Sequence, residues 1–100
     1  MIAKAKVYDY LGEVIDPEMG INIIELGLVY RVAVEEDSVE VDFTLTYPGC
    51  PLGPEIEKDI IEVLRKKAGV TDVKTTVVWQ PAWQPSYMSE EARIGLGYPI

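Results

Sequence analysis

The sequence predicts an α/β (α+β) domain, a two-layer sandwich with helices packed on one face of a small mixed sheet. Two segments have helical apolar spacing and three alternate apolar and polar residues. Two amphipathic helices need one sheet face to bury against. The expected order is helix, strand, strand, helix, strand, short helix, and we expect the 100 residues to form one domain, 1–100.

The first expected element is a helix. Its apolar residues recur at the i, i+4, i+7 and i+8 positions of one helix face: Val7, Leu11, Val14 and Ile15. We expect it to end near Asp16, because Pro17 disfavours helical geometry in the residue before it. Residues 16–27 contain proline, glycine and asparagine at short intervals, so we expect an ordered loop there.

Two alternating segments follow and predict an antiparallel hairpin with one buried face. Apolar side chains occupy every second position in residues 28–34 and again in residues 39–45, and residues 36–38 form the turn between them. Residues 46–54 then break the second strand with three prolines and two glycines.

A second helix should begin near Pro54, which suits a first helical turn. Its apolar face is Ile56, Ile60, Val63 and Leu64. Gly69 is expected to end it in the left-handed conformation. A third strand spans residues 73–79, and the helix before it implies a parallel crossover, so the sheet should be mixed. After a proline-rich segment, Ser89 should cap a short helix from Glu90 to about Leu96.

The composition excludes several kinds of chemistry. The chain has no histidine and a single cysteine, Cys50. A Ser-His-Asp triad or a Cys-His pair cannot form within it. A histidine-based zinc site, a CxxC redox pair and an intrachain disulfide are excluded as well.

The charge is acidic, with 9 basic and 17 acidic side chains and a net charge of −8. Nucleic-acid binders usually carry a basic face, so we expect no nucleic-acid partner. The stretch between Lys6 and Arg31 has no cation; it is either a solvated surface or a patch for a basic partner or a cation. No apolar run approaches the ~18–20 residues that span a bilayer, so we expect no membrane association. A lone thiol suits a reducing compartment, and we expect the cytoplasm.

Cys50 is the one soft ligand or nucleophile in the chain. It precedes the second predicted helix, where backbone N–H groups and the helix dipole favour an anion, so a thiolate should form readily. Gly49 and Gly53 would let the backbone approach a ligand closely. A small buried cysteine with a purely structural role fits the same pattern.

Two carboxylates form a second candidate group. Asp16 and Glu18 flank Pro17, which stiffens the backbone between them. They could converge on a cation or on a Lys or Arg of a partner. Alternatively, the same three residues simply stop the preceding helix.

The aromatic and proline-rich segment near the C-terminus is a candidate for binding partners. Trp79 and Trp83 bracket Pro81; such clusters mark interaction surfaces or fold their rings over a sheet edge. Arg93 is the only cation after Lys74, and could pair with Glu90 or with the acidic loop.

Several motifs, in order, resemble those of the MIP18 family (formerly DUF59), including its SufT-like and PaaD-like members. They are VIDPE at 14–18, GINI at 20–23, ELGLVY at 25–30, TLTYPGCP at 44–51, WQPAW at 79–83 and MSEEAR at 88–93. The resemblance covers nearly the whole chain. It implies the fold of the iron–sulfur cluster assembly domain.

The resemblance also implies an accessory role in assembling iron–sulfur clusters or transferring them to target proteins. Asp16 and Glu18 match the family's D-P-E motif, Thr46 the threonine before the cysteine, and Cys50 the cysteine itself. The implied partners are the assembly machinery and apo target proteins. PaaD-like members carry extra cysteines that this chain lacks, which disfavours a phenylacetate-specific role.

Clusters usually take about four thiolates and this chain has one. We therefore expect no permanently bound cofactor. Cys50 would be a metal ligand in a transient iron–sulfur cluster shared between chains, and a homodimer is one arrangement that would allow this. Alternatively, Cys50 only contacts the machinery. Two rivals remain open: a cysteine-dependent acyl- or thiol-transfer enzyme with a carboxylate base, and a structural adaptor that binds partners through its Trp/Pro segment.

Overall fold

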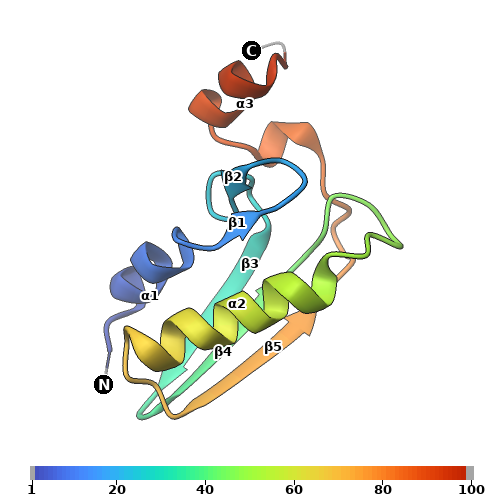
Figure 1. The fold of residues 1–100 in the computed structure, drawn as a ribbon. Helices are drawn as coiled ribbons and strands as arrows, with labels where there is room; N and C mark the ends of the chain where they lie inside the picture. The colour runs from blue at the N-terminus through green and yellow to red at the C-terminus, as the bar shows by residue number, and fades with distance from the viewer. Residues whose placement is uncertain (1, 99–100) are drawn as a thin grey trace.

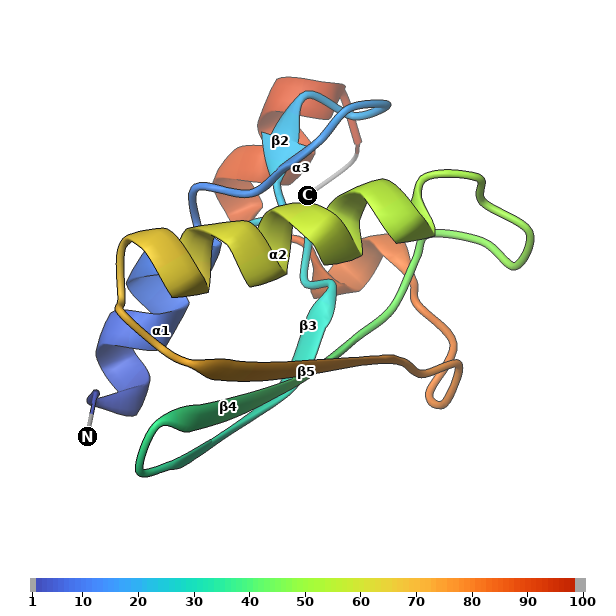
Figure 2. The ribbon, with the colours of Figure 1, turned by 60° about the horizontal axis from the view of Figure 1, so that its bottom comes forward.

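The computed structural model describes residues 2–98 and contains a three-stranded mixed sheet with helices on one face (Figures 1 and 2). The strand order is β3 (Val29–Glu35), β4 (Ser38–Phe43), β5 (Asp72–Val77). Strands β3 and β4 pair antiparallel, whereas β4 and β5 pair parallel. Figure 2 shows α1 (Lys4–Leu11) and α2 (Gly53–Lys66) on the same side of this sheet. The predicted two-layer α/β fold is therefore confirmed.

The core lies between the sheet and the two helices. The side chains of Ile56, Ile60 and Leu64 are fully buried along one face of α2, and Phe43 is fully buried on β4. Burying an aliphatic or aromatic side chain of this size contributes about 1.5–3 kcal/mol, so this face accounts for much of the fold's stability.

Helix α2 has the predicted ends. Pro54 lies in its first turn, and Gly69 just beyond it has φ 70°, the left-handed conformation. The Val70 N–H donates to the Leu64 carbonyl at 3.2 Å and closes the end of the helix. The helix runs beside β5 and completes the crossover between the two parallel strands.

The first helix is shorter than expected, and the prediction that it ends near Asp16 is wrong. Helix α1 ends at Leu11, and Gly12 is its C-cap. Residues Ile15–Asp16 form β1, which pairs antiparallel with β2 (Ile21–Asn22) in a small hairpin. Val14 is buried after a turn, while Ile15 is 45% exposed, so their apolar spacing did not report one helix face.

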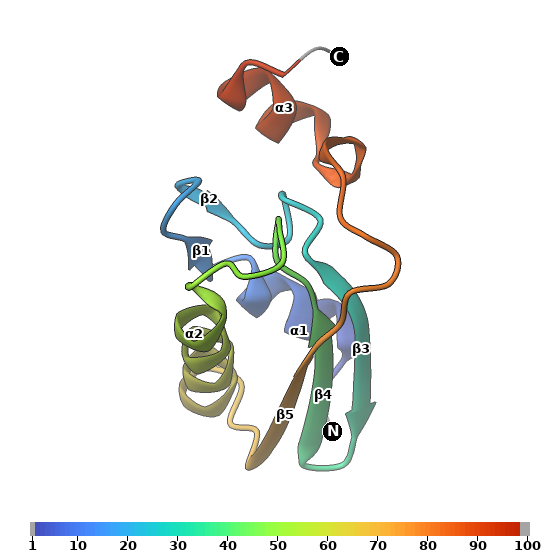
Figure 3. The same ribbon diagram turned by 90° about the vertical axis from the view of Figure 1, so that its right-hand side faces the viewer.

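The C-terminal segment leaves β5 and crosses the end of the sheet toward β3 (Figure 3). It contains the short 3₁₀ helix η1 (Pro85–Tyr87) and α3 (Glu90–Leu96). The Ser89 hydroxyl caps α3 by accepting from the Ala92 N–H at 3.1 Å, as predicted. Gly27 permits the close approach of this segment, because a Cβ at Gly27 would lie 2.3 Å from the Tyr87 carbonyl oxygen.

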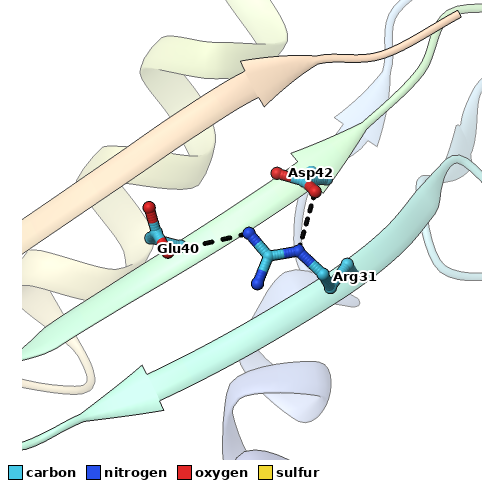
Figure 4. Close-up of polar contacts among 3 residues, drawn as sticks. All are labelled: Arg31, Glu40 and Asp42. Atoms are coloured by element: carbon cyan, nitrogen blue, oxygen red, sulfur yellow. Dashed lines mark hydrogen bonds and ion pairs between the residues drawn. The ribbon is translucent and has the colours of Figure 1, made fainter.

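The other face of the sheet carries charged side chains instead of helices. Arg31 Nε lies 2.8 Å from Asp42 Oδ2, and Arg31 Nη2 lies 3.6 Å from Glu40 Oε2 (Figure 4). The Arg31 side chain is 51% exposed, and exposed ion pairs of this kind contribute at most about 1 kcal/mol. Within residues 2–98, no helix combines the length and apolar character needed to cross a bilayer.

Candidate functional site

Cys50 lies in the loop that connects β4 to α2. Because β4 and β5 are parallel, this loop stands outside the carboxyl ends of two strands, where α/β domains commonly place their sites. The Cys50 side chain is nearly buried, at 9% exposure, and α2 begins three residues later at Gly53. Gly49, just before Cys50, has φ 88° and makes the sharp turn that the loop needs.

The β1–β2 hairpin brings a carboxylate to this thiol. The Cys50 Sγ–H points to Glu18 Oε2 across 4.0 Å, although the two residues are separated by 32 positions in the sequence. The Glu18 residue is exposed, so the carboxylate can contact both the thiol and solvent. Of the predicted loop residues, the structure thus brings Glu18 and Cys50 together directly.

Asp16 has a different position from Glu18. It is only 3% exposed, and its Oδ1 accepts hydrogen bonds from the Glu18 N–H at 2.8 Å and the Met19 N–H at 3.2 Å. The Asp16 carbonyl also accepts from the Gly20 N–H at 2.8 Å. Asp16 therefore shapes the hairpin that presents Glu18.

Tyr47 is a residue that the sequence reasoning missed. Its backbone carbonyl accepts from the Cys50 N–H at 3.3 Å, and its side chain is 46% exposed. The Glu18 carboxylate raises the pKa of the Tyr47 phenol, and reduced hydration, Cys50 and Asp16 add to the effect. The aromatic side chain of Tyr47 between Thr46 and Pro48 was the available signal.

Thr46 lies in the same loop and is half-buried. The nearby Thr44 is 1% exposed, and its Oγ1 has no partner among the same residues. Across the described chain, no three His, Cys, Asp or Glu side chains lie close enough together to hold a metal ion. One chain thus offers a single thiol where a cluster usually takes four ligands.

The two tryptophans of the C-terminal segment differ in their surroundings. Trp83 packs against the core, and its Nε1–H donates to the Leu26 carbonyl at 2.8 Å. Trp79 is 43% exposed. Arg93 is half-buried, and its Nε has no hydrogen-bond partner among residues 2–98; neither of its two expected ion pairs forms there.

Comparison with known proteins identifies the family. A sequence model described as "Iron-sulfur cluster assembly protein" matches residues 4–77. The chain belongs to this family. The predicted resemblance to an iron–sulfur cluster assembly family is thereby confirmed.

Curated relatives match the chain over most of their own length. The "Fe-S protein maturation auxiliary factor SufT" of Staphylococcus aureus is 47% identical over 85 residues, which are 84% of this chain and 97% of that protein. The "Fe-S protein maturation auxiliary factor YitW" of Bacillus subtilis is 40% identical over 95 residues, 94% of this chain and 93% of that protein.

A solved structure supports the fold. The crystal structure of a DUF59 domain from Bacillus anthracis superposes with a TM-score of 0.91 at 39% identity, covering 96% of this chain and 92% of that one. The family match ends at Val77, whereas this superposition covers 96% of the chain.

Proposed function

We propose that this chain is an accessory factor that assembles iron–sulfur clusters or transfers them to target proteins. The proposal depends on the position of Cys50, which is the only thiol in the chain, within a protein that belongs to this family. Cys50 lies at the carboxyl ends of two parallel strands, with Glu18 beside it. Curated relatives bear names of maturation auxiliary factors, which supports a role outside catalysis.

In this proposal the cluster is a cargo with no permanent place in the chain. Cys50 supplies one ligand, and the remaining ligands come from the assembly machinery, from an apo target protein or from a second copy of the chain. When the Cys50 thiol binds iron it loses its proton, and Glu18 lies where it can accept that proton. Transfer is then ligand exchange: a target thiolate replaces the Cys50 thiolate on iron, and neither the cluster nor the thiolates are oxidised or reduced.

The proposal places the chain in the cytoplasm, in contact with the assembly machinery and with apo target proteins. Asp16 holds the hairpin, Glu18 and Cys50 meet the cargo, and Thr46 lines the same loop. Arg93 and Trp79 of the C-terminal segment are the proposed partner-binding residues, whereas Trp83 is held in place by its hydrogen bond to Leu26.

Replacement of the thiol tests this function. In cells lacking the gene, Cys50→Ala should fail to restore the activity of iron–sulfur enzymes that the wild type restores, while circular dichroism shows the same folded state. Cys50→Ser tests whether an oxygen can replace the sulfur. Full restoration by Cys50→Ala would contradict the proposal. Anaerobic reconstitution with iron and sulfide, read by absorbance, should give less cluster signal for Cys50→Ala than for wild type.

An enzymatic function is the second candidate, and the Cys50–Glu18 contact favours it. A carboxylate 4.0 Å from a thiol can act as a base for a nucleophilic cysteine in acyl or thiol transfer. Mass spectrometry should then detect a covalent Cys50 adduct after incubation with a thioester, and Glu18→Gln should slow its formation. Absence of an adduct would exclude this candidate and leave the accessory role.

A further inference from the structure

Strand β5 lies at an edge of the sheet and turns part of its backbone outward. The Asp72 N–H donates to the Asp37 carbonyl at 3.1 Å. At the other end of the strand, the Val78 N–H donates to the Phe43 carbonyl at 2.8 Å. Because backbone groups alternate in direction along a strand, every second residue from Asp72 to Val78 faces β4, and the residues between them point away from it. The outward residues are Val73, Thr75 and Val77.

The two edges of the sheet differ in their protection. Strand β3 has a β-bulge between Val29 and Arg31, and residues 2–4 lie beside it. Strand β5 keeps an unbroken register with β4 from Asp72 to Val77 and contains no proline. A regular edge of this kind can accept a further strand through its outward backbone groups.

One side of helix α2 adjoins this edge. The Thr75 hydroxyl donates to Glu57 Oε2 at 2.6 Å, and α2 runs along β5 (Figure 2). Glu57, Ile61 and Arg65 recur at every fourth position and therefore share one side of the helix. A hollow of about 540 Å³ lies on this side and is lined by Pro54, Glu57, Lys58, Ile61, Glu62, Arg65 and Lys66. We call the outward residues of β5 together with these α2 residues the edge surface.

The charges on the α2 part of the edge surface favour an acidic partner. Both of its carboxylates are engaged, because Glu57 accepts from β5 and Glu62 pairs with Lys66 at 2.8 Å. Lys58 and Arg65 are exposed, and neither forms an ion pair within 4 Å among residues 2–98. Two cations are thus left to bind carboxylates, in a chain whose net charge is −8.

The spacing of these side chains suits an extended segment. Lys58 and Arg65 lie about 10 Å apart along the helix axis, with the half-buried Ile61 between them. Side chains at positions i, i+2 and i+4 of a strand share one face and span about 13 Å, so an acidic, an aliphatic and a second acidic side chain can meet the three in turn. The opposite face of β5 carries Asp72 and Lys74, one charge of each sign.

A second copy of the chain fits the β5 edge less well. Only one antiparallel self-pairing uses all three outward residues, and it sets Thr75 opposite its own copy. Since Thr75 binds Glu57, this register brings two Glu57 carboxylates together. A shift of two residues toward the beginning of the strand sets Lys74 opposite its own copy, and like charges opposite one another destabilise a strand pair. A segment of another protein avoids both repulsions.

We propose that the edge surface binds an extended acidic segment of a partner protein as a fourth strand of the sheet. Backbone hydrogen bonds to the outward residues of β5 give affinity. Contact of an aliphatic side chain with Ile61, and of carboxylates with Lys58 and Arg65, gives selectivity. The inference goes beyond the proposed function, because strand binding requires neither Cys50 nor a cluster.

Amide hydrogen exchange of the ¹⁵N-labelled full chain tests the added strand. The probe is a short synthetic peptide in which glutamate, valine and glutamate alternate with threonines. At a peptide concentration ten times its Kd, exchange of the Val73, Thr75 and Val77 amides should slow about tenfold. The Lys74 and Thr76 amides already face β4 and should change little. Absence of slowing at the three outward amides would overturn the proposal.

Two modified peptides distinguish backbone pairing from side-chain contact. One carries N-methyl groups on the threonines, and the other carries them on the glutamates and the valine. A methylated amide cannot donate, so only one of the two should lose binding. Loss with the methylated glutamates and valine indicates an antiparallel strand, and loss with the methylated threonines a parallel one. Equal binding or equal loss for the two peptides would contradict strand addition.

Charge variants test the acidic partner. A peptide with lysine in place of glutamate should bind about tenfold more weakly, and Arg65→Glu should weaken binding of the glutamate peptide about fivefold. Lys4→Glu changes the net charge equally, but Lys4 is exposed beside β3, so this variant should bind like the wild type. Equal losses in the two variants, or equal binding of the two peptides, would exclude an acidic occupant.

Two further measurements complete the test. Cys50→Ala should bind the glutamate peptide like the wild type, whatever its effect on iron–sulfur enzymes. Without peptide, sedimentation and hydrogen exchange are compared at several protein concentrations. A dimer together with concentration-dependent protection of the three outward amides would overturn the proposal, because a second copy would then occupy the edge.

Discussion

Asp16 and Glu18 lie two residues apart on one hairpin but relate to the molecule in opposite ways. Asp16 is buried and holds two backbone N–H groups, whereas Glu18 is exposed and meets the Cys50 thiol. The same contrast separates Trp83, which is tied to Leu26, from Trp79, which is exposed. Each pair therefore has one member that builds the fold and one that remains available for binding. Two glycines with positive φ differ in a comparable way: the C-terminal segment packs closely on Gly27, whereas the space around Gly20 is open.

The largest expected effect is the loss of stability on replacing Gly27 by alanine, compared with the same replacement at Gly20. Both have φ near 70°, but a Cβ at Gly27 would meet the Tyr87 carbonyl at 2.3 Å, and one at Gly20 would meet nothing within 4 Å. Gly27→Ala should lower the free energy of unfolding by about 3 kcal/mol or more, and Gly20→Ala by about 1–2 kcal/mol. Urea denaturation measures both, and equal losses would show that the C-terminal segment is not held at Gly27.

The two carboxylates of the hairpin should differ next. Asp16→Ala removes an acceptor shared by two N–H groups and should cost about 1–2 kcal/mol of unfolding free energy. Glu18→Ala should stay within about 0.5 kcal/mol, since an exposed side chain is removed. Asp16→Asn retains an oxygen acceptor and should recover much of the loss. If Glu18→Ala destabilised as much as Asp16→Ala, the two residues would not divide as the structure indicates.

A smaller difference is expected for the tryptophans. Trp83→Phe keeps a ring in the core but leaves the Leu26 carbonyl without its indole donor, which should cost about 1 kcal/mol. Trp79→Phe removes no hydrogen bond among the described residues and should cost less than about 0.5 kcal/mol. Thermal unfolding of both variants measures the difference, and a greater loss for Trp79→Phe would reverse the assignment.

Periodic segments were the part of the fold that could be predicted from the sequence. Strands β3 and β4 and helix α2 begin and end within about two residues of the expected bounds, because alternation and helical spacing report a buried face. The β1–β2 hairpin was not predicted, since strands of two residues carry no period. The position of Gly12 at the end of α1 was a signal that the apolar spacing obscured.

The candidate site was predictable only in part, for a related reason. Asp16, Glu18 and Cys50 belong to motifs, yet no spacing rule shows that Glu18 meets Cys50 across 32 positions while Asp16 turns inward. That outcome depends on how the hairpin packs against the loop after β4. Likewise, proline-rich sequence around both tryptophans did not distinguish Trp79 from Trp83, because the difference arises from a contact with Leu26.

The finest test of the comparison is the ionisation of Tyr47. The Glu18 carboxylate is the main cause of the raised pKa of the Tyr47 phenol, because a negative neighbour disfavours the phenolate. Glu18→Gln should therefore lower the pKa of Tyr47 toward the ordinary value of a tyrosine. An NMR titration of the tyrosine ring signals measures this shift, and comparison with Tyr47→Phe identifies the signals of Tyr47. A spectrophotometric titration of the phenols gives a second measurement.

The sign of the effect on stability follows from the same pKa. The folded state holds the Tyr47 proton more tightly than the unfolded chain, so the free energy of unfolding falls as the pH rises from the unfolded pKa through the folded one. In Glu18→Gln this alkaline loss should shrink, while Asp16→Asn should change it less, because Asp16 is the smallest of the contributions to the pKa of Tyr47. If the pKa of Tyr47 were unchanged in Glu18→Gln, the Glu18 carboxylate would not face the loop that carries Tyr47 and Cys50. The contact between Glu18 and the Cys50 thiol would then be contradicted.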